Sequence, residues 1–173
     1  MNHHSGLLAV TRFTAIVLIP SALIVAAPAS TGTSGEVAEL FQHAKSTAAQ
    51  LRRDVVEMGT YARSRVTWQS HAGQISRITE HVNKAGQLAA QMEKLRAGAE
   101  PWHQTAIDRL TPLLRELASN IQAMIVHINK QTNMLDLNYN RYLKENEDLA
   151  TELSSLISTT VDYDMTKAEM QKL

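Results

Sequence analysis

Five histidines follow the apolar N-terminal segment of the chain, and imidazole is the side chain best suited to proton transfer and metal binding near neutral pH. They are His43, His71, His81, His103 and His127. No two of them are four positions apart, so no helix would present the His-x-x-x-His pair that places two imidazoles on one face. His71 falls on an apolar helical seam. We expect it at a helix end with its ring tip in water, and the alternative is a buried ligand or pH switch. His127 is expected at the solvated edge of its seam.

Two patterns could hold a cofactor. Glu100 and His103 have the Glu-x-x-His spacing of di-iron bundles, but such sites need two copies and two further inward Glu residues. Met58, Met92 and Met124 lie on seams, and exported bundles resembling this one in architecture can hold haem between a Met and a His. A Met on an apolar stripe usually fills the core. We therefore expect no cofactor, and a haem- or metal-binding bundle is the less favoured alternative.

Trp68 and Trp102 each lie at a boundary between two predicted helices. A Trp at such a place closes the end of a core, which is the favoured interpretation, or marks a contact with a partner or a membrane interface. Together with His71, these two residues are the candidates for a contact site. The sequence predicts no catalytic residue and no metal ligand.

Several classes of function are excluded or disfavoured by composition. The chain has no Cys, which excludes thiol catalysis, thiolate metal sites and disulfides. It has no Gly-x-Ser-x-Gly, phosphate loop or dinucleotide fingerprint, so we predict that it is not an enzyme. Its formal net charge is zero, which gives no electrostatic basis for binding nucleic acid.

The N-terminus has the order of a secretory signal peptide. Arg12 precedes an uncharged apolar stretch, residues 13–27, which ends at the small-residue pattern Ala27-Pro28-Ala29. The stretch is shorter than the roughly 20 residues of a membrane-spanning helix. We expect residues 1–29 to be a cleaved signal peptide and the protein to be exported to the periplasm or the extracellular space. The alternative is an uncleaved anchor formed by residues 13–29 in the inner membrane.

Apolar residues spaced alternately by three and four predict four long helices with the seams of coiled-coil geometry. We expect these helices at about 35–65, 69–96, 101–132 and 138–160, the last with a continuation toward Met170 left open. In the last helix the predicted seam is Tyr142, Asn146, Leu149, Leu153, Leu156, Thr160 and Tyr163. Pro112 is expected to kink the third helix, and the alternative is two helices split at Thr111.

Long helices with short connections predict an all-α, up-down-up-down antiparallel four-helix bundle. The bundle would span residues 35–173, behind a flexible mature N-terminus at 30–34. In that topology Arg52 and Arg53 would be level with Glu152. The number and length of the helices resemble the periplasmic ligand-binding bundles of chemoreceptors.

The sequence does not specify a biological role. We expect an exported, non-enzymatic helical interaction or structural protein of the bacterial envelope, with an unknown protein partner or a second copy of the chain. The alternative is a membrane-tethered ligand-binding or sensory bundle, in which the retained leader would be the link to the membrane. Fold alone does not decide between them, because functional sites are grafted onto bundles of one architecture.

Overall fold

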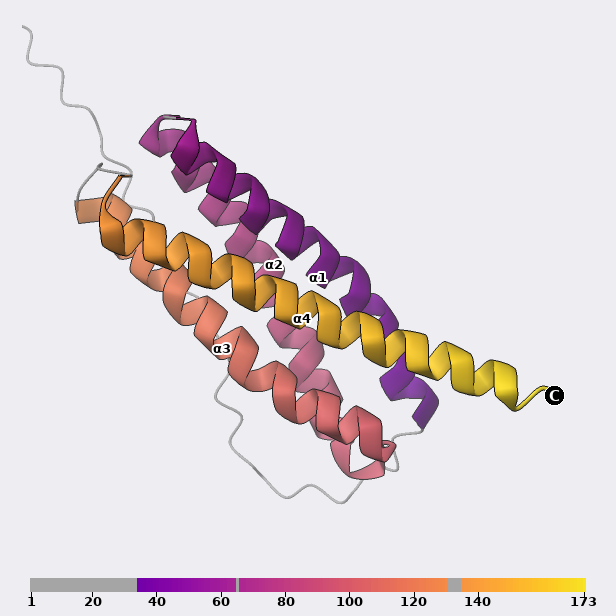
Figure 1. Ribbon diagram of the computed structural model, residues 1–173. Helices are drawn as coiled ribbons and strands as arrows, with labels where there is room; N and C mark the ends of the chain where they lie inside the picture. The colour runs from indigo at the N-terminus through magenta and orange to yellow at the C-terminus, as the bar shows by residue number, and fades with distance from the viewer. Residues whose placement is uncertain (1–33, 65, 131–134) are drawn as a thin grey trace, which may run out of the picture.

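The computed structural model describes residues 34–64, 66–130 and 135–173. In these residues the protein is all-α, with four long helices, one short 3-10 helix and no strand (Figure 1). The elements are α1 (Ser34–Arg63), α2 (Trp68–Leu95), η1 (Arg96–Gly98), α3 (Pro101–Lys130) and α4 (Leu137–Met170). The predicted leader, residues 1–29, lies outside the described residues.

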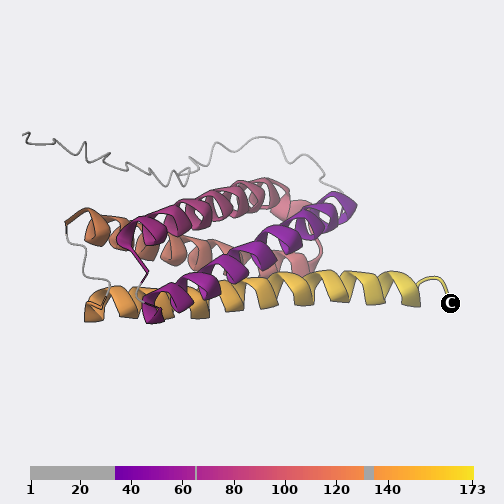
Figure 2. The same cartoon turned by 90° about the horizontal axis from the view of Figure 1, so that it is seen from above.

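The four helices form a bundle in which each helix packs on two principal neighbours. Helix α1 lies against α2 and α4, and α3 lies against the same two helices. Neighbours run in opposite directions: Lys45 of α1 binds Asp162 of α4, whereas Gly59 further along α1 approaches Glu147 nearer the start of α4. Figures 1 and 2 show the same alternation for successive helices.

The bundle therefore has two ends of different composition. At one end α1 is followed by α2, and α3 by α4; Tyr139 lies there, and we call it the Tyr139 end. At the other end η1 joins α2 to α3 beside Trp102, and we call it the Trp102 end.

The predicted helix positions are confirmed to within a few residues. Helix α3 continues through Pro112, which is exposed on its surface, so the alternative of two helices split at Thr111 is wrong. Pro112 is tolerated because the apolar contacts of α3 continue on both sides of it, at Leu110 and Leu114, both buried. The continuation of the last helix beyond residue 160, left open by the sequence, is present, since α4 continues to Met170.

The core is built from the seams of α1, α2 and α3 largely as their spacing predicts. Their fully enclosed large side chains are Phe41, Leu51, Met58, Met92, Ile107, Leu110, Leu117, Ile121 and Met124. Because each such side chain removes a large apolar area from water, at roughly 25 cal/mol per Å², these seams supply most of the stabilisation of the bundle.

Every second residue of the seam predicted for α4 is wrong by one position. Asn146, Leu153 and Thr160 are buried as expected. The other buried positions are Tyr139, Leu143, Ala150, Ile157 and Val161, whereas Tyr142, Leu149 and Leu156 are only partly buried and Tyr163 is exposed. Apolar residues flank the shared positions on both sides, so periodicity does not show which flank faces the other helices.

The sequence predicts that Glu152 lies at the same height in the bundle as Arg52 and Arg53 of α1. Among the described residues, Glu152 forms no ion pair with α1. Glu152 instead lies 3.3 Å from Arg109 of α3. Since both side chains are more than half exposed, this pair contributes little to stability.

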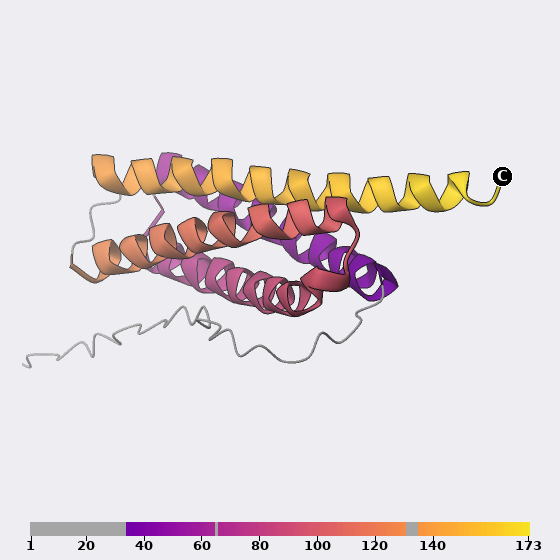
Figure 3. The ribbon, with the colours of Figure 1, turned by 90° about the horizontal axis from the view of Figure 1, so that it is seen from below.

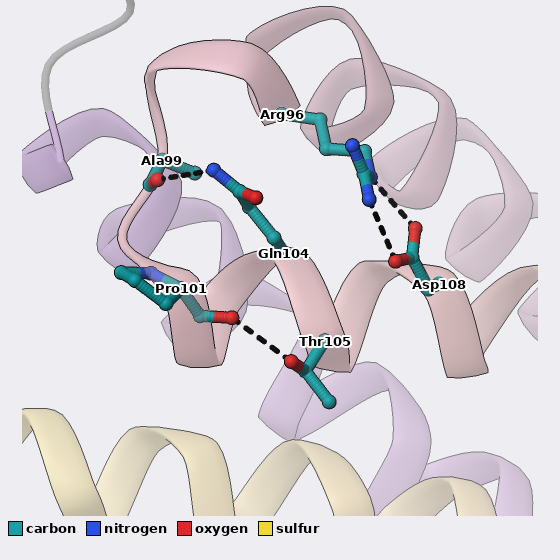
Figure 4. A network of polar contacts seen from close by, with 6 residues as sticks. All are labelled: Arg96, Ala99, Pro101, Gln104, Thr105 and Asp108. Carbon is teal, nitrogen blue, oxygen red and sulfur yellow. Dashed lines mark hydrogen bonds and ion pairs between the residues drawn. The ribbon is translucent and has the colours of Figure 1, made fainter.

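The connection at the Trp102 end is held by side chains of its own (Figure 4). Arg96 donates two hydrogen bonds, of 2.6 and 2.7 Å, to the carboxylate of Asp108. Gln104 donates to the backbone oxygen of Ala99 at 2.8 Å. These bonds join the end of α2 and η1 to the first two turns of α3 and so fix the path of the chain beside Trp102.

No helix in the described part of the chain is both long and apolar enough to cross a membrane.

Candidate functional site

The three contact candidates lie at opposite ends of the bundle. Trp68 and His71 belong to the first turn of α2 at the Tyr139 end, whereas Trp102 begins α3 at the other end. Trp68 is 36% exposed, and His71 is fully buried. The structure therefore brings Trp68 and His71 to one region and separates Trp102 from both.

His71 is the centre of a buried polar cluster. Its exposed fraction is 0%, so the expectation that its ring tip reaches water is wrong. Nδ1 lies 2.8 Å from the hydroxyl oxygen of Tyr139, which is also 0% exposed. Nε2 is buried and has no hydrogen-bond partner among the described residues. The ring is enclosed because Tyr139, at the first turn of α4, packs directly against the first turn of α2.

Other aromatic rings surround this pair. The ring of His127 lies 5.1 Å from that of Tyr139, and the ring of Tyr61 lies 6.1 Å from that of His71, edge to face. His127 is 9% exposed, so it lies at the boundary of the core and is not a solvated residue. The hydroxyl of Tyr61 donates to Glu57 at 2.7 Å, so the polar end of that ring is directed to an exposed carboxylate.

Burial shifts both groups of the central pair toward their neutral forms. It lowers the pKa of His71 from its ordinary value of 6.5, because a buried imidazolium loses its hydration. It raises the pKa of Tyr139 above the ordinary 10.0 for the same reason, since a phenolate would be buried without water. The cluster is therefore electrically neutral around pH 7.

A second polar cluster holds α4 to α3 at the Trp102 end. The carboxylate of Asp164 accepts a hydrogen bond from the indole Nε1 of Trp102 at 2.9 Å, and its other oxygen lies 2.8 Å from Nε2 of His103. His103 is 1% exposed and stacks on Phe41 of α1 with ring centroids 5.4 Å apart. We call Trp102, His103 and Asp164 the Asp164 clamp. It gives Trp102 a role in joining two helices.

Neighbouring side chains of α4 extend the clamp. The ammonium of Lys167 lies 3.9 Å from the centre of the Trp102 ring, a cation–π contact, and 3.5 Å from Glu100. Tyr163 packs edge-on against the same indole, with centroids 5.0 Å apart. Trp102 is thus covered by three side chains from little more than one turn of α4.

The C-terminal section of α4, residues 162–170, begins beside the clamp and continues past it. Trp102 is the second residue of α3 and lies beside Asp164, so the rest of α4 extends beyond the start of α3. Figures 1 and 3 show this part of α4 extending beyond the other helices. It exposes large apolar side chains: Tyr163 is 52% exposed, Met165 53% and Met170 70%.

The structure does not assemble the cofactor patterns of the sequence. Glu100 turns to Lys167 and His103 to Asp164, so the Glu-x-x-His pair does not converge on one point. His71 and Met92 lie near opposite ends of α2, so they cannot bind one haem together. The sulfur of Met124 accepts a hydrogen bond from the side-chain amide of Asn146. Among the described residues, no group of three or more His, Asp or Glu is arranged to hold a metal ion.

An open groove of about 620 Å³ runs along α4 beside Arg109 of α3. Two of its three acidic lining residues are paired: Glu152 with Arg109, and Asp148 with Lys144 at 2.5 Å. The third, Glu147, lines the same side, so the groove is an open face with more negative than positive charge.

Sequence reasoning did not place Tyr139 and Asp164 on the inward face of the last helix, although both are important there. Both follow the true seam of α4: Asp164 is seven positions after Ile157, and Tyr139 is seven before Asn146. Extending the heptad with the correct flank would have placed both on the inward face. What hid them was the choice of flank, together with an end placed near residue 160.

The described residues thus define an all-α four-helix protein with a polar cluster at each end of its core. No family model matches the chain, and neither a curated protein nor a solved structure matches it.

Proposed function

We propose that this protein is an exported, non-enzymatic interaction protein that contacts another protein through the C-terminal section of α4. The observation that carries the proposal is the exposure of Tyr163, Met165 and Met170 on a helix section that extends past the start of α3. Tyr163 and Met170 are seven positions apart and lie on one face of α4, whereas Met165 lies on the other. An exposed apolar face is typical of a protein contact site.

The anchoring of this section supports the proposal. Asp164 and Lys167 bind Trp102 and its neighbours, and Asp162 binds Lys45 of α1 at 2.8 Å. A helix held in place before binding loses little conformational entropy when a partner docks. Methionine adds adaptability, because its unbranched side chain adjusts to the shape of an opposing surface.

Export is supported by the sequence of residues 1–29, with its single Arg, apolar stretch and Ala-x-Ala ending. In the proposed function the bundle acts outside the cytoplasm, after removal of this leader. Mass spectrometry of the protein recovered from the envelope of a producing bacterium tests this step. A mass that begins at Ser30 is expected, and a full-length mass would favour the anchored alternative.

Site-specific photocrosslinking tests the contact itself. A photoreactive phenylalanine analogue is placed at Met165 or Met170 in cells that naturally make the protein. The control is the same analogue at Val126 of α3, which is 39% exposed on another part of the surface. A discrete adduct at 165 and 170 that is absent at 126 is the expected result.

Each other outcome has a meaning. Equal adducts at all three positions, or none at any, would overturn the proposed contact surface. An adduct with twice the mass of the chain would identify the partner as a second copy.

A further inference from the structure

We propose that the His71–Tyr139 pair makes the Tyr139 end of the bundle acid-sensitive, so that protonation of His71 opens this end while the Trp102 end stays closed. Both side chains are fully buried and hydrogen-bonded to each other across α2 and α4. This property is independent of the contact surface proposed on α4.

The hydrogen bonding of His71 is complete on only one side of the ring. Nδ1 is paired with the Tyr139 hydroxyl, and Nε2 is buried without a partner in the part of the chain that the structure describes. A neutral imidazole leaves one orphaned donor or acceptor at Nε2, which is tolerable. An imidazolium has two N–H donors, so protonation leaves an unpaired N–H that also carries positive charge inside the core.

The described groups around His71 offer that charge no direct partner. From α1, the ring of Tyr61 lies T-shaped to that of His71, and its hydroxyl donates to Glu57, which is exposed. From α3, the nearby titratable group is His127, and from α4 it is Tyr139, a neutral phenol at acid pH. On α2 itself, Arg77 is already cationic and is hydrogen-bonded to Gln74.

These neighbours make the closed end unfavourable for a protonated His71. Glu57 is exposed to water, where its attraction is screened. Of the other described carboxylates at this end, Asp54 lies 2.9 Å from Nδ1 of His81, and Asp136 accepts hydrogen bonds from the backbone N–H groups of Asn138 and Tyr139. Arg77 and His127 add positive charge or none. A buried charge without a partner is relieved when the local structure opens and water reaches the ring.

The direction of the pH effect follows from linkage. Burial lowers the pKa of His71 below 6.5, so an opened or unfolded state binds more protons than the closed state when the pH falls below about 6.5. The stabilising effect of a neutral His71 is complete above that pH. It declines as the pH falls, by a factor of about ten in the opening equilibrium per pH unit for one proton, until the lower pKa of the closed state is reached.

The opposite end also contains a buried histidine, His103, whose Nδ1 has no hydrogen-bond partner among the described residues. The difference is the group at its other nitrogen: Nε2 lies 2.8 Å from the carboxylate of Asp164, whereas His71 faces a phenol. The structure therefore predicts local opening at the Tyr139 end and none at the clamp.

Hydrogen exchange with mass spectrometry tests the proposal on the whole protein as it is isolated from cells. The exchange rates of the backbone amides are compared at pH 7.0 and 5.0, after correction for intrinsic exchange rates. Peptides within 68–78 and 137–146 are expected to lose protection about tenfold per pH unit below 6.5. Peptides within 41–51 and 153–161 are expected to keep theirs. Equal loss at both ends, or no loss at either, would overturn the proposal.

Two variants assign the effect to one ring. His71→Phe keeps a ring of similar size and removes the titrating nitrogens, so the loss of protection at pH 5.0 is expected to disappear. His43→Phe, at an exposed position of α1, is the matched control and should keep it. If His71→Phe opens with acid as the natural protein does, another group is responsible.

A direct titration remains decisive if His71→Phe does not fold. The ring protons of His71 in the natural protein are followed by NMR between pH 4 and 8. A midpoint below 6.5, accompanied by shifts at Tyr139, is expected. A midpoint at or above 6.5 would overturn the proposal whatever the variants do.

Discussion

The hydroxyl of Tyr139, in the first turn of α4, lies 2.8 Å from Nδ1 of His71, in the first turn of α2, and neither side chain is exposed to solvent. The two residues are 68 positions apart in the chain. Their hydrogen bond joins the starts of two helices that are diagonal to each other in the bundle. Removing it therefore tests whether these two helices meet at this end.

Replacing Tyr139 by Phe should destabilise the protein by about 1–3 kcal/mol, because Nδ1 of His71 would be left buried without a partner. The measurement is the free energy of unfolding in urea at pH 7.5. Tyr163→Phe is the control, since its hydroxyl lies on a side chain that is 52% exposed. Equal changes for the two variants would show that the His71–Tyr139 bond contributes nothing.

Alkali should destabilise the protein through Tyr139. Burial raises the pKa of this phenol above 10.0, so the folded state holds its proton when the unfolded state has lost it. Stability is retained below pH 10 and should then fall by about 1.4 kcal/mol per pH unit for this group. Urea unfolding of the natural protein and Tyr139→Phe between pH 9 and 11 measures the difference, and parallel curves would contradict it.

Two neighbouring acids of α4 should differ in their contribution to stability. Asp164→Ala removes the acceptor of both His103 and Trp102 and should cost about 2–3 kcal/mol, because His103 is almost completely buried. Asp162→Ala removes an ion pair with Lys45 in which both side chains are exposed, and should cost less than about 1 kcal/mol. Thermal unfolding compares them, and the reverse order would refute the clamp.

Glycine in the middle of α2 is not required by close packing. A Cβ added at Gly73 or Gly86 would have no atom within 4 Å outside the local helix backbone. Because glycine costs about 1 kcal/mol relative to alanine inside a helix, Gly73→Ala and Gly86→Ala should each stabilise the protein by about 0.5–1 kcal/mol. A loss of stability in urea unfolding would mean that the helices approach more closely there.

Pro112→Ala should stabilise the protein by about 1–3 kcal/mol, because alanine restores the missing N–H to an unbroken α3 and removes the steric clash of the ring. Gln122→Ala, at another exposed position of the same helix, should change stability by less than about 0.5 kcal/mol. Chemical unfolding measures both. Destabilisation by Pro112→Ala would show that the proline is needed where it stands.

Local patterns were sufficient for most of the architecture. Gly98 and Pro101 separate α2 from α3, and the spacing of residues such as Phe41, Ile78 and Leu117 predicts which faces of the first three helices are buried. These features depend on residues within a few turns of one another, so a single sequence contains them. They identify helices, but not the polar groups that meet between them.

Residue pairs distant in the chain decided the candidate sites. His71 was predicted to reach water because its own helix ends nearby, and it is buried because Tyr139 of α4 covers it. Asp164 was not singled out, and it becomes the acceptor for two side chains of α3.

The sequence by itself determined that the described part of the chain is four long helices, where each begins and ends to within a few residues except at the end of α4, and which face of α1, α2 and α3 is apolar. Helical periodicity and helix-ending residues are local, so they could be read without the fold. Only the tertiary structure decided which flank of α4 faces inward, that His71 is enclosed, and that Asp164 joins α4 to α3. Each of those depends on the geometry between helices, where burial and hydrogen bonding are shared by residues that the sequence leaves far apart.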